Sequence, residues 1–148
     1  MNATDPASRA KAYPFRLLDH SFLMTAAGPR PLSKGEPIPG RDHRFPVLAS
    51  GSNMSPERLA EKYPDLSEPI AVVRARVRDF DSVYAAHVTS YGAIASTPFP
   101  SPGTLAQLAV LWLTEEEILT MHETEALVIT TPMAASTGST FSWRGGSG

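Results

Sequence analysis

The chain has no cysteine and almost no excess of charge, and these shortages exclude several classes of protein. Without cysteine it forms no disulfide, no thiol nucleophile and no thiolate metal site. The formal net charge is −2 over 148 residues, so no global basic field attracts nucleic acid or an anionic membrane. No apolar run approaches the ~20 residues that a membrane-spanning helix needs. We therefore expect neither a nucleic-acid partner nor a membrane partner.

The start of the chain also lacks a targeting signal. Residues 1–11 have neither the basic start nor the apolar stretch of a secretory signal peptide, which favours a cytoplasmic location. Apolar residues make up 42% and charged residues 19% of the sequence, as in a globular protein. At this length one α+β domain with a modest core is expected.

Three zones differ in composition. Residues 1–44 form a leader rich in Pro and Gly, in which the run Ala27 to Gly40 is expected to sustain neither a helix nor a ladder. The apolar segment Phe22 to Met24 inside it either docks on the domain or belongs to a disordered leader. Residues 45–132 read as the folded domain. Residues 133–148 read as a flexible tail rich in Gly and Ser, or as a chain that ends early.

Within the central zone, apolar runs, turn residues and helix caps predict alternating strands and helices. Ser55, Pro56 and Glu57 are typical of a helix start, and Thr114 with Glu117 forms a capping box. The expected elements, in order, are a buried strand over 45–49, a helix from 55 to about 63, a strand over 70–77, a turn at 79–81, a strand over 82–88, a loop over 98–103, a strand over 105–113, a helix from 114 to about 126 and a strand over 127–131.

The helix that begins at Thr114 places one carboxyl group on its apolar side. Ile118 and Glu125 are seven residues apart and share a face, with Met121 and His122 between them, whereas Glu116 and Glu123 form a solvent face. Partial burial and the negative end of the helix dipole would both raise the pKa of Glu125. Such a group suits general acid–base catalysis near neutral pH. The alternative is that Glu125 frays into solvent at the end of the helix.

A second candidate feature is the loop Gly51-Ser52-Asn53, which lies between an apolar strand and a capped helix. A strand–turn–helix junction exposes backbone N–H groups at the positive end of the helix dipole, where a carboxylate or an oxyanion is favoured. Gly51 would let a ligand approach the backbone closely. The spacing is not that of a phosphate-binding loop for nucleotides. An ordinary turn is the alternative.

Other chemically active side chains have simpler interpretations. His87 and His122 with Glu125 would make a metal site, but a lone histidine on a helix face is more often a packing residue, so no metal and no cofactor are expected. Ser52 as a nucleophile lacks a base in the sequence. Tyr84 and Tyr91 would line a pocket or the core. Arg74, Arg76 and Arg78 share one strand face, which is most simply solvated and alternatively binds an anion.

The order of these elements resembles the γ-glutamylcyclotransferase-like superfamily. Members typically begin with a strand that ends Tyr-Gly-Ser-Asn-Leu, and have a helix that ends in a pattern such as Leu-Asp-x-x-Glu-Gly. The matching stretches here are Leu48-Ala49-Ser50-Gly51-Ser52-Asn53-Met54, then Ser-Pro-Glu-Arg-Leu, then Gly92-Ala93-Ile94-Ala95-Ser96 with Ser101-Pro102-Gly103, and finally Met121-His122-Glu123-Thr124-Glu125-Ala126. The resemblance covers about residues 45 to 130.

The resemblance implies a fold and an activity. The fold is a small mixed β-barrel with flanking helices and a pocket at one barrel end. The activity is cyclisation of a γ-glutamyl amine or dipeptide to 5-oxoproline, as in glutathione metabolism, with Glu125 as general acid/base and no cofactor. The substrate would be bound by the loop residues Ser50, Gly51, Ser52, Asn53 and Met54, chiefly through backbone N–H groups of Gly51 to Asn53.

The sequence also departs from the family pattern. Ser50 stands where the family usually has tyrosine, Ala126 replaces the usual glycine, and the region after the helix is short. These departures favour a second interpretation, in which the protein keeps the fold and binds a small ligand or a partner without catalysis. The oligomeric state and the leaving amine are not fixed by the sequence.

Overall fold

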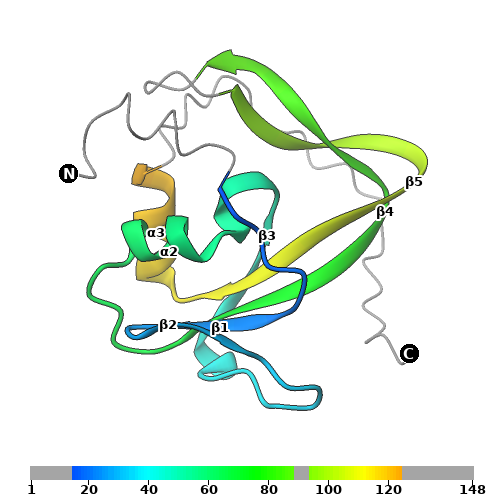
Figure 1. Ribbon diagram of the computed structural model, residues 1–148. Helices are drawn as coiled ribbons and strands as arrows, with labels where there is room; N and C mark the ends of the chain where they lie inside the picture. Colours follow the sequence, from blue (N-terminus) through cyan, green and yellow to red (C-terminus); the bar gives the residue numbers. More distant parts are fainter. Residues whose placement is uncertain (1–14, 89–93, 125–148) are drawn as a thin grey trace.

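Five antiparallel strands and two α-helices make up the part of the chain that the structure describes, residues 15–88 and 94–124 of a computed structural model (Figure 1). The elements, in chain order, are β1 (Phe22–Thr25), β2 (Gly28–Pro31), the 3₁₀ helix η1 (Arg41–His43), β3 (Phe45–Ala49), the 3₁₀ helix η2 (Gly51–Met54), α2 (Pro56–Lys62), β4 (Ile70–Val88), β5 (Ile94–Leu113) and α3 (Glu115–Thr124). The α+β class expected from the sequence is confirmed.

The strands form one sheet in the order β2-β1-β4-β5-β3, and every neighbouring pair is antiparallel. Among the described residues the sheet is open, with β2 at one edge and β3 at the other. The edge position explains why β3, expected to be buried, has Phe45 and Leu48 exposed and only Ala49 fully buried. The expectation of a buried strand at 45–49 was therefore right in its bounds and wrong in its burial.

The proline-rich N-terminal zone contributes two strands to this sheet. Phe22, Leu23 and Met24 are all buried, and β1 lies between β2 and β4, so this apolar segment docks on the domain. The run from Ala27 was expected to form no ladder, and that prediction is wrong because Gly28–Pro31 pairs with β1. Prolines are tolerated in β2 because an edge strand does not need every N–H for pairing.

The longest elements, β4 and β5, replace the separate strands, the turn and the loop that the sequence predicts. The register passes from Arg78 opposite Leu105 to Phe80 opposite Pro100, so residues 101–104 have no partner in β4. Asp79 takes a left-handed conformation (φ 64°), and its carboxylate accepts a hydrogen bond from the Gly103 N–H at 2.9 Å. The turn residues at 79–81 thus make a bulge that bends one continuous hairpin, because aspartate tolerates the left-handed region.

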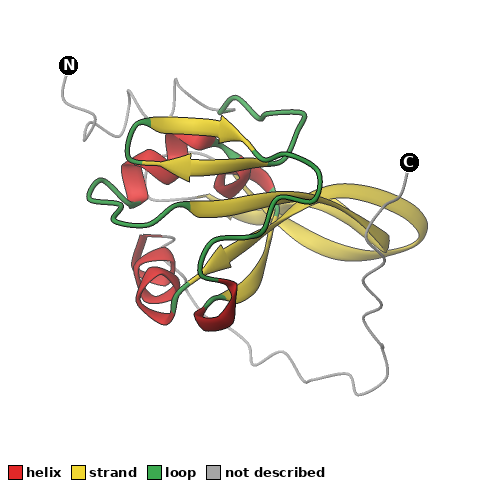
Figure 2. Ribbon diagram, turned by 90° about the horizontal axis from the view of Figure 1, so that it is seen from below, coloured by secondary structure: helices red, strands yellow, loops and turns green. Residues whose placement is uncertain are grey.

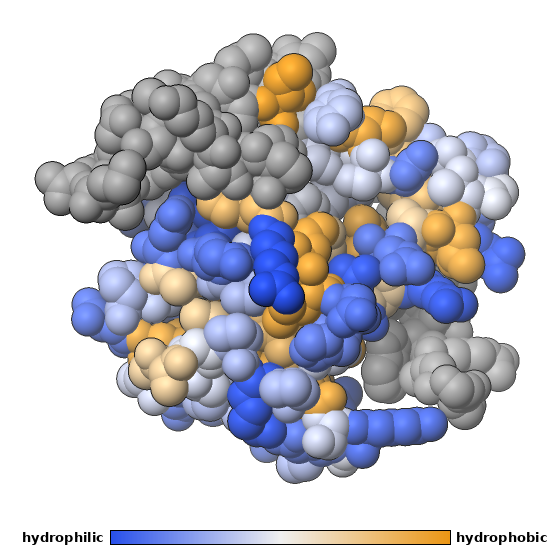
Figure 3. Space-filling model, viewed as in Figure 1, coloured by the Kyte–Doolittle hydropathy of each residue, from blue (hydrophilic) through white to orange (hydrophobic). Residues whose placement is uncertain are grey.

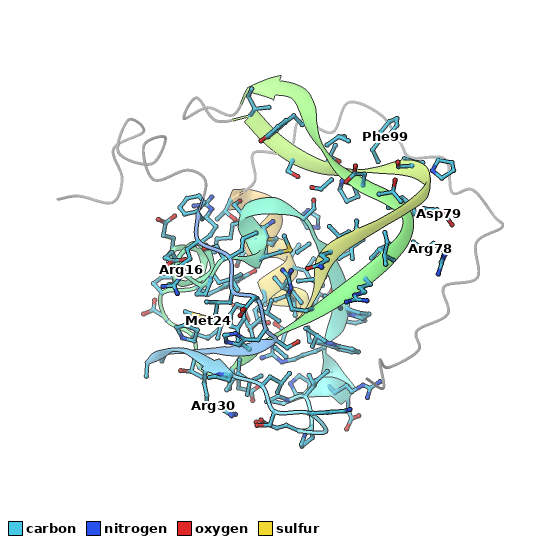
Figure 4. The ribbon with its side chains drawn as sticks, turned by 45° about the vertical axis from the view of Figure 1, so that its right-hand side comes forward. Arg16, Met24, Arg30, Arg78, Asp79 and Phe99 are labelled. Carbon is cyan, nitrogen blue, oxygen red and sulfur yellow. The ribbon has the colours of Figure 1, made fainter. Side chains whose placement is uncertain are left out.

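The bend divides the hairpin into two halves. Arg78, Asp79 and Phe99 lie at the bend, away from the helices (Figure 4), and the bend projects beyond the rest of the molecule when it is seen from below (Figure 2). Apolar and polar side chains are interspersed on the face seen in Figure 3. Beyond the bend the hairpin turns back over the sheet towards η2 (Figure 1).

The core lies between the sheet and the two helices, which are neighbours on one side of the strands (Figure 1). Leu59 from α2 and Met121 from α3 meet the central strands at Ile70, Val72 and Leu111, and all five side chains are buried. Helix α2 begins at Pro56 as predicted, and the capping box of α3 is confirmed. The Glu117 carboxylate accepts the Thr114 N–H at 2.8 Å, and the Glu117 N–H donates to the Thr114 hydroxyl at 3.2 Å.

A buried arginine joins these elements. Arg44 precedes β3, and its side chain is 1% exposed. Its Nη1 donates to the Trp112 carbonyl oxygen at 2.9 Å and to the Glu117 carboxylate at 2.6 Å, and its Nη2 lies 3.4 Å from the Glu68 carboxylate. The Tyr63 hydroxyl donates to the Glu117 carbonyl oxygen at 2.8 Å. The first turn of α3 is therefore held against the end of β5 and the segment after α2.

We expect Arg44→Met to lower the free energy of unfolding by about 3 kcal/mol, because the Glu117 carboxylate, whose side chain is only 15% exposed, then loses its cation. Urea unfolding followed by circular dichroism measures this. The matched control is Arg76→Met on the exposed side of β4, which should change stability by less than about 0.5 kcal/mol. Equal effects of the two substitutions would contradict the role given to Arg44.

Candidate functional site

The predicted strand–turn–helix junction is present at the end of β3. Ser50 is extended, Gly51 is left-handed (φ 74°), and η2 runs directly into α2. Met54 is buried in the core, whereas Ser50, Gly51, Ser52 and Asn53 are half-buried. The turn is thus anchored by its last residue and keeps part of its surface open to solvent.

The start of α2 differs in one detail from the expected cap. Ser55 is the N-cap residue, but its hydroxyl donates to the Glu57 carboxylate at 2.6 Å and makes no hydrogen bond to a backbone N–H of the helix. Its N–H donates to the Ser52 carbonyl oxygen at 2.9 Å, which closes the η2 turn. The serine therefore stabilises the junction through its neighbours in sequence, and it is fully buried.

The returning half of the β4–β5 hairpin lies against this turn. A Cβ atom added to Gly51 would lie 3.0 Å from the Cβ of Ser96, which is closer than side chains normally pack. The Ser96 hydroxyl is in turn 2.5 Å from the Ser82 hydroxyl. Ser96 belongs to the stretch that carries the family resemblance, but no pattern in the sequence marked it as a neighbour of Gly51. The contact depends on the bend in the hairpin.

A buried lysine also contacts the turn. Lys62 is the last residue of α2, and it is 5% exposed. Its Nζ donates to Asn53 Oδ1 at 2.7 Å and lies 2.9 Å from Met121 Sδ. One ammonium group therefore contacts both η2 and α3. Sequence reasoning missed Lys62, although its position three residues after the buried Leu59 places it on the inner side of α2.

The inner face of α3 agrees with the sequence prediction at Ile118 and Met121 and differs at His122. Met121 is buried, and Ile118 is partly buried against the core, whereas Glu116 and Glu123 are exposed. His122 was expected on the inner face but is exposed, because one residue turns an α-helix by about 100° and carries it away from the core side that Met121 occupies. Glu125 lies outside the described residues, so its distance from the Gly51–Asn53 turn stays a prediction. The same holds for the strand expected at 127–131, for Tyr91 and for the side chain of His87.

The remaining candidates have surface positions. Tyr84 is exposed on the returning half of the hairpin, and Arg76 and Arg78 are exposed on β4. Arg74 is half-buried and donates to the Gln107 side chain at 3.0 Å. Across residues 15–88 and 94–124, no group of three or more His, Asp or Glu side chains is arranged to hold a metal ion.

A hollow of about 470 Å³ lies beside Lys62, between the segment that follows α2 and the first turns of α3. Arg44 and Lys62 line it together with acidic side chains, among them Glu68, Glu116 and Glu117. No residue of η2 lines it. The hollow is therefore separate from the turn that the sequence proposes as the binding site.

The chain was compared with protein-family models, with curated proteins and with solved structures, and none of them matches it. The resemblance to the γ-glutamylcyclotransferase-like superfamily thus stays a prediction that depends on the motifs of this chain. In the described part of the chain, no helix has both the length and the apolar character needed to cross a membrane.

The packing of Gly51 against Ser96 can be tested separately from its backbone conformation. We expect Gly51→Ala to lower the free energy of unfolding by about 2 kcal/mol or more, because a left-handed φ costs ~1–2 kcal/mol for alanine and the new methyl group meets Ser96. The matched control is Gly35→Ala. Gly35 has a similar φ of 81°, but no atom lies within 4 Å of an added Cβ.

The difference between the two glycine variants, measured by urea unfolding, isolates the contact with the hairpin. In a Ser96→Gly background this difference should disappear, because the atom that the new methyl group meets is gone. A difference that persists in that background would show that the hairpin does not pack on the turn as described.

Proposed function

We propose that this protein is a γ-glutamylcyclotransferase-like enzyme, which converts a γ-glutamyl amine or dipeptide to 5-oxoproline and releases the amine. The observation that best supports the proposal is that one side chain, Lys62, links η2 and α3, the two elements that carry the motifs of the family. Lys62 contacts both Asn53 in the predicted binding turn and Met121 on the inner face of α3. Glu125, the predicted acid/base, follows Met121 by four residues in the sequence.

The reaction needs one acid/base group and a binding site that holds the substrate folded. In the proposed mechanism, Glu125 takes a proton from the α-amino group of the substrate, whose nitrogen attacks the γ-carbonyl carbon. A new C–N bond closes the five-membered lactam while the original amide C–N bond breaks. Glu125 then returns the proton to the departing amine, so no net proton is gained or lost. Because nucleophile and carbonyl belong to one molecule, orientation supplies much of the rate.

The turn would bind the γ-glutamyl group from Ser50 to Met54, with backbone N–H groups of Gly51, Ser52 and Asn53 as donors. The half-buried position of these residues is compatible with a small ligand that the β4–β5 hairpin covers on one side. In this proposal, further pairing closes the open sheet into the small barrel of the family. No metal and no cofactor take part.

Replacement of the acid/base provides the direct test. We expect Glu125→Gln to reduce the rate of 5-oxoproline formation from γ-glutamyl dipeptides by ~100-fold or more, since glutamine cannot carry the proton. Glu123→Gln, an exposed neighbour on the same helix, is the matched control and should retain activity. Formation of product at equal rates by the Glu125→Gln variant and the unchanged protein would remove Glu125 from the mechanism.

A second candidate function is supported by Ser50, which stands where the family usually has tyrosine. A ring that helps to shape the family's pocket would then be missing here. The protein would then bind a γ-glutamyl or lactam ligand on the same turn and not transform it. Binding of 5-oxoproline in the absence of any turnover distinguishes this candidate from the enzyme.

A further inference from the structure

Lys62, which connects the η2 turn to α3, is a buried cation. Its contact with Asn53 is a hydrogen bond, which fixes an orientation as well as filling space. We propose that Lys62 is a positioning residue, whose ammonium fixes the Asn53 carboxamide, and with it the η2 turn, against the inner face of α3. The inference rests on the proposed function, because it gives η2 the role of ligand-binding turn.

The chemistry of the contact determines the orientation of Asn53. A lysine ammonium has three N–H donors and no acceptor, so only the oxygen of a carboxamide can face it. Lys62 Nζ lies 2.7 Å from Asn53 Oδ1, and the opposite orientation would direct N–H groups of both residues at each other. The ammonium thus selects one of the two orientations of the amide and keeps the Nδ2 group on the side turned away from Lys62.

Burial makes this selection strong. Lys62 is 5% exposed, and Met121 Sδ lies 2.9 Å from Nζ on the side of α3. A hydrogen bond to a charged group is stronger than one between neutral groups, and more so where water is excluded. A methionine at position 62 would fill a similar space without the cost of burying a charge, but it would offer Asn53 no donor. The ammonium therefore orients the Asn53 carboxamide, which an apolar side chain cannot do.

A double-mutant cycle on ligand affinity tests the proposal. The probe is 5-oxoproline, titrated by calorimetry into the full chain and into the variants Lys62→Met, Asn53→Ala and the double variant. We expect each single substitution to weaken binding about tenfold, and the double variant to bind no more weakly than about tenfold, because Lys62 acts through Asn53. Lys34→Met removes an exposed lysine and should leave the affinity unchanged.

Three outcomes overturn the proposal. They are an unchanged affinity in Lys62→Met, a roughly hundredfold loss in the double variant, as independent effects would give, and no binding of 5-oxoproline by the unsubstituted chain. If Lys62→Met does not fold, Lys62→Arg replaces it in the cycle. Arginine keeps donors for Asn53 Oδ1, so its affinity should fall by less than that of Asn53→Ala, and an equal fall overturns the proposal.

The same set of variants separates this inference from the proposed activity. If γ-glutamyl dipeptides are not turned over but the cycle shows coupling, the enzyme proposal fails and the role of Lys62 stands. If the dipeptides are turned over and Lys62→Met has the KM and kcat of the unsubstituted chain, the enzyme proposal stands and the role of Lys62 fails.

Discussion

The buried ion pair between Arg44 and Glu117 is the interaction on which the arrangement of the helices depends. Arg44 sits at the entry of the edge strand β3, bonds to the carbonyl of Trp112 near the end of β5, and neutralises a carboxylate in the first turn of α3. Glu117 also completes the capping box. The direction in which α3 leaves the sheet is therefore set at its first turn, by a cation that is far away in sequence. Because a helix is rigid, that direction also determines where Met121 meets Lys62.

The bulge at Asp79 is the second constraint, and it acts on the site through the β4–β5 hairpin. Without it, two strands of about 20 residues would extend past the core, and their outer halves would pack against no other element. The left-handed Asp79 and its hydrogen bond to Gly103 bend the hairpin, and the half beyond the bend returns until Ser96 meets Gly51. The turn thus contacts the distant hairpin through Gly51 and the following helix α2 through Asn53, which bonds to Lys62.

Local signals predicted the elements that are defined locally. Pro56 suits the first position of a helix because it has no N–H to leave unpaired there and its φ is already helical. Thr114 and Glu117 satisfy each other's backbone N–H groups, and α2 and α3 begin where these residues predict. The sequence predictions failed where a residue fits two local structures and only the tertiary structure decides between them. Asp79 suits a turn and a bulge equally well, and only the partner strand selects the bulge. Prolines disfavour a ladder unless the strand lies at an edge, which sequence does not reveal for β2.

In the candidate site, too, local features were predicted and features that depend on tertiary packing were not. The Gly51–Asn53 turn was predicted because its signal is local, whereas Ser96 and Lys62 were not, because their roles arise from packing between distant segments. A charged end of a short helix usually points to solvent, and burying it runs against the ordinary preference of lysine. Departures of this kind are expected where a fold accepts a cost for function. That Lys62 is buried against the very turn that the motif pattern selects, and not elsewhere in the core, is therefore an independent reason to place the function there.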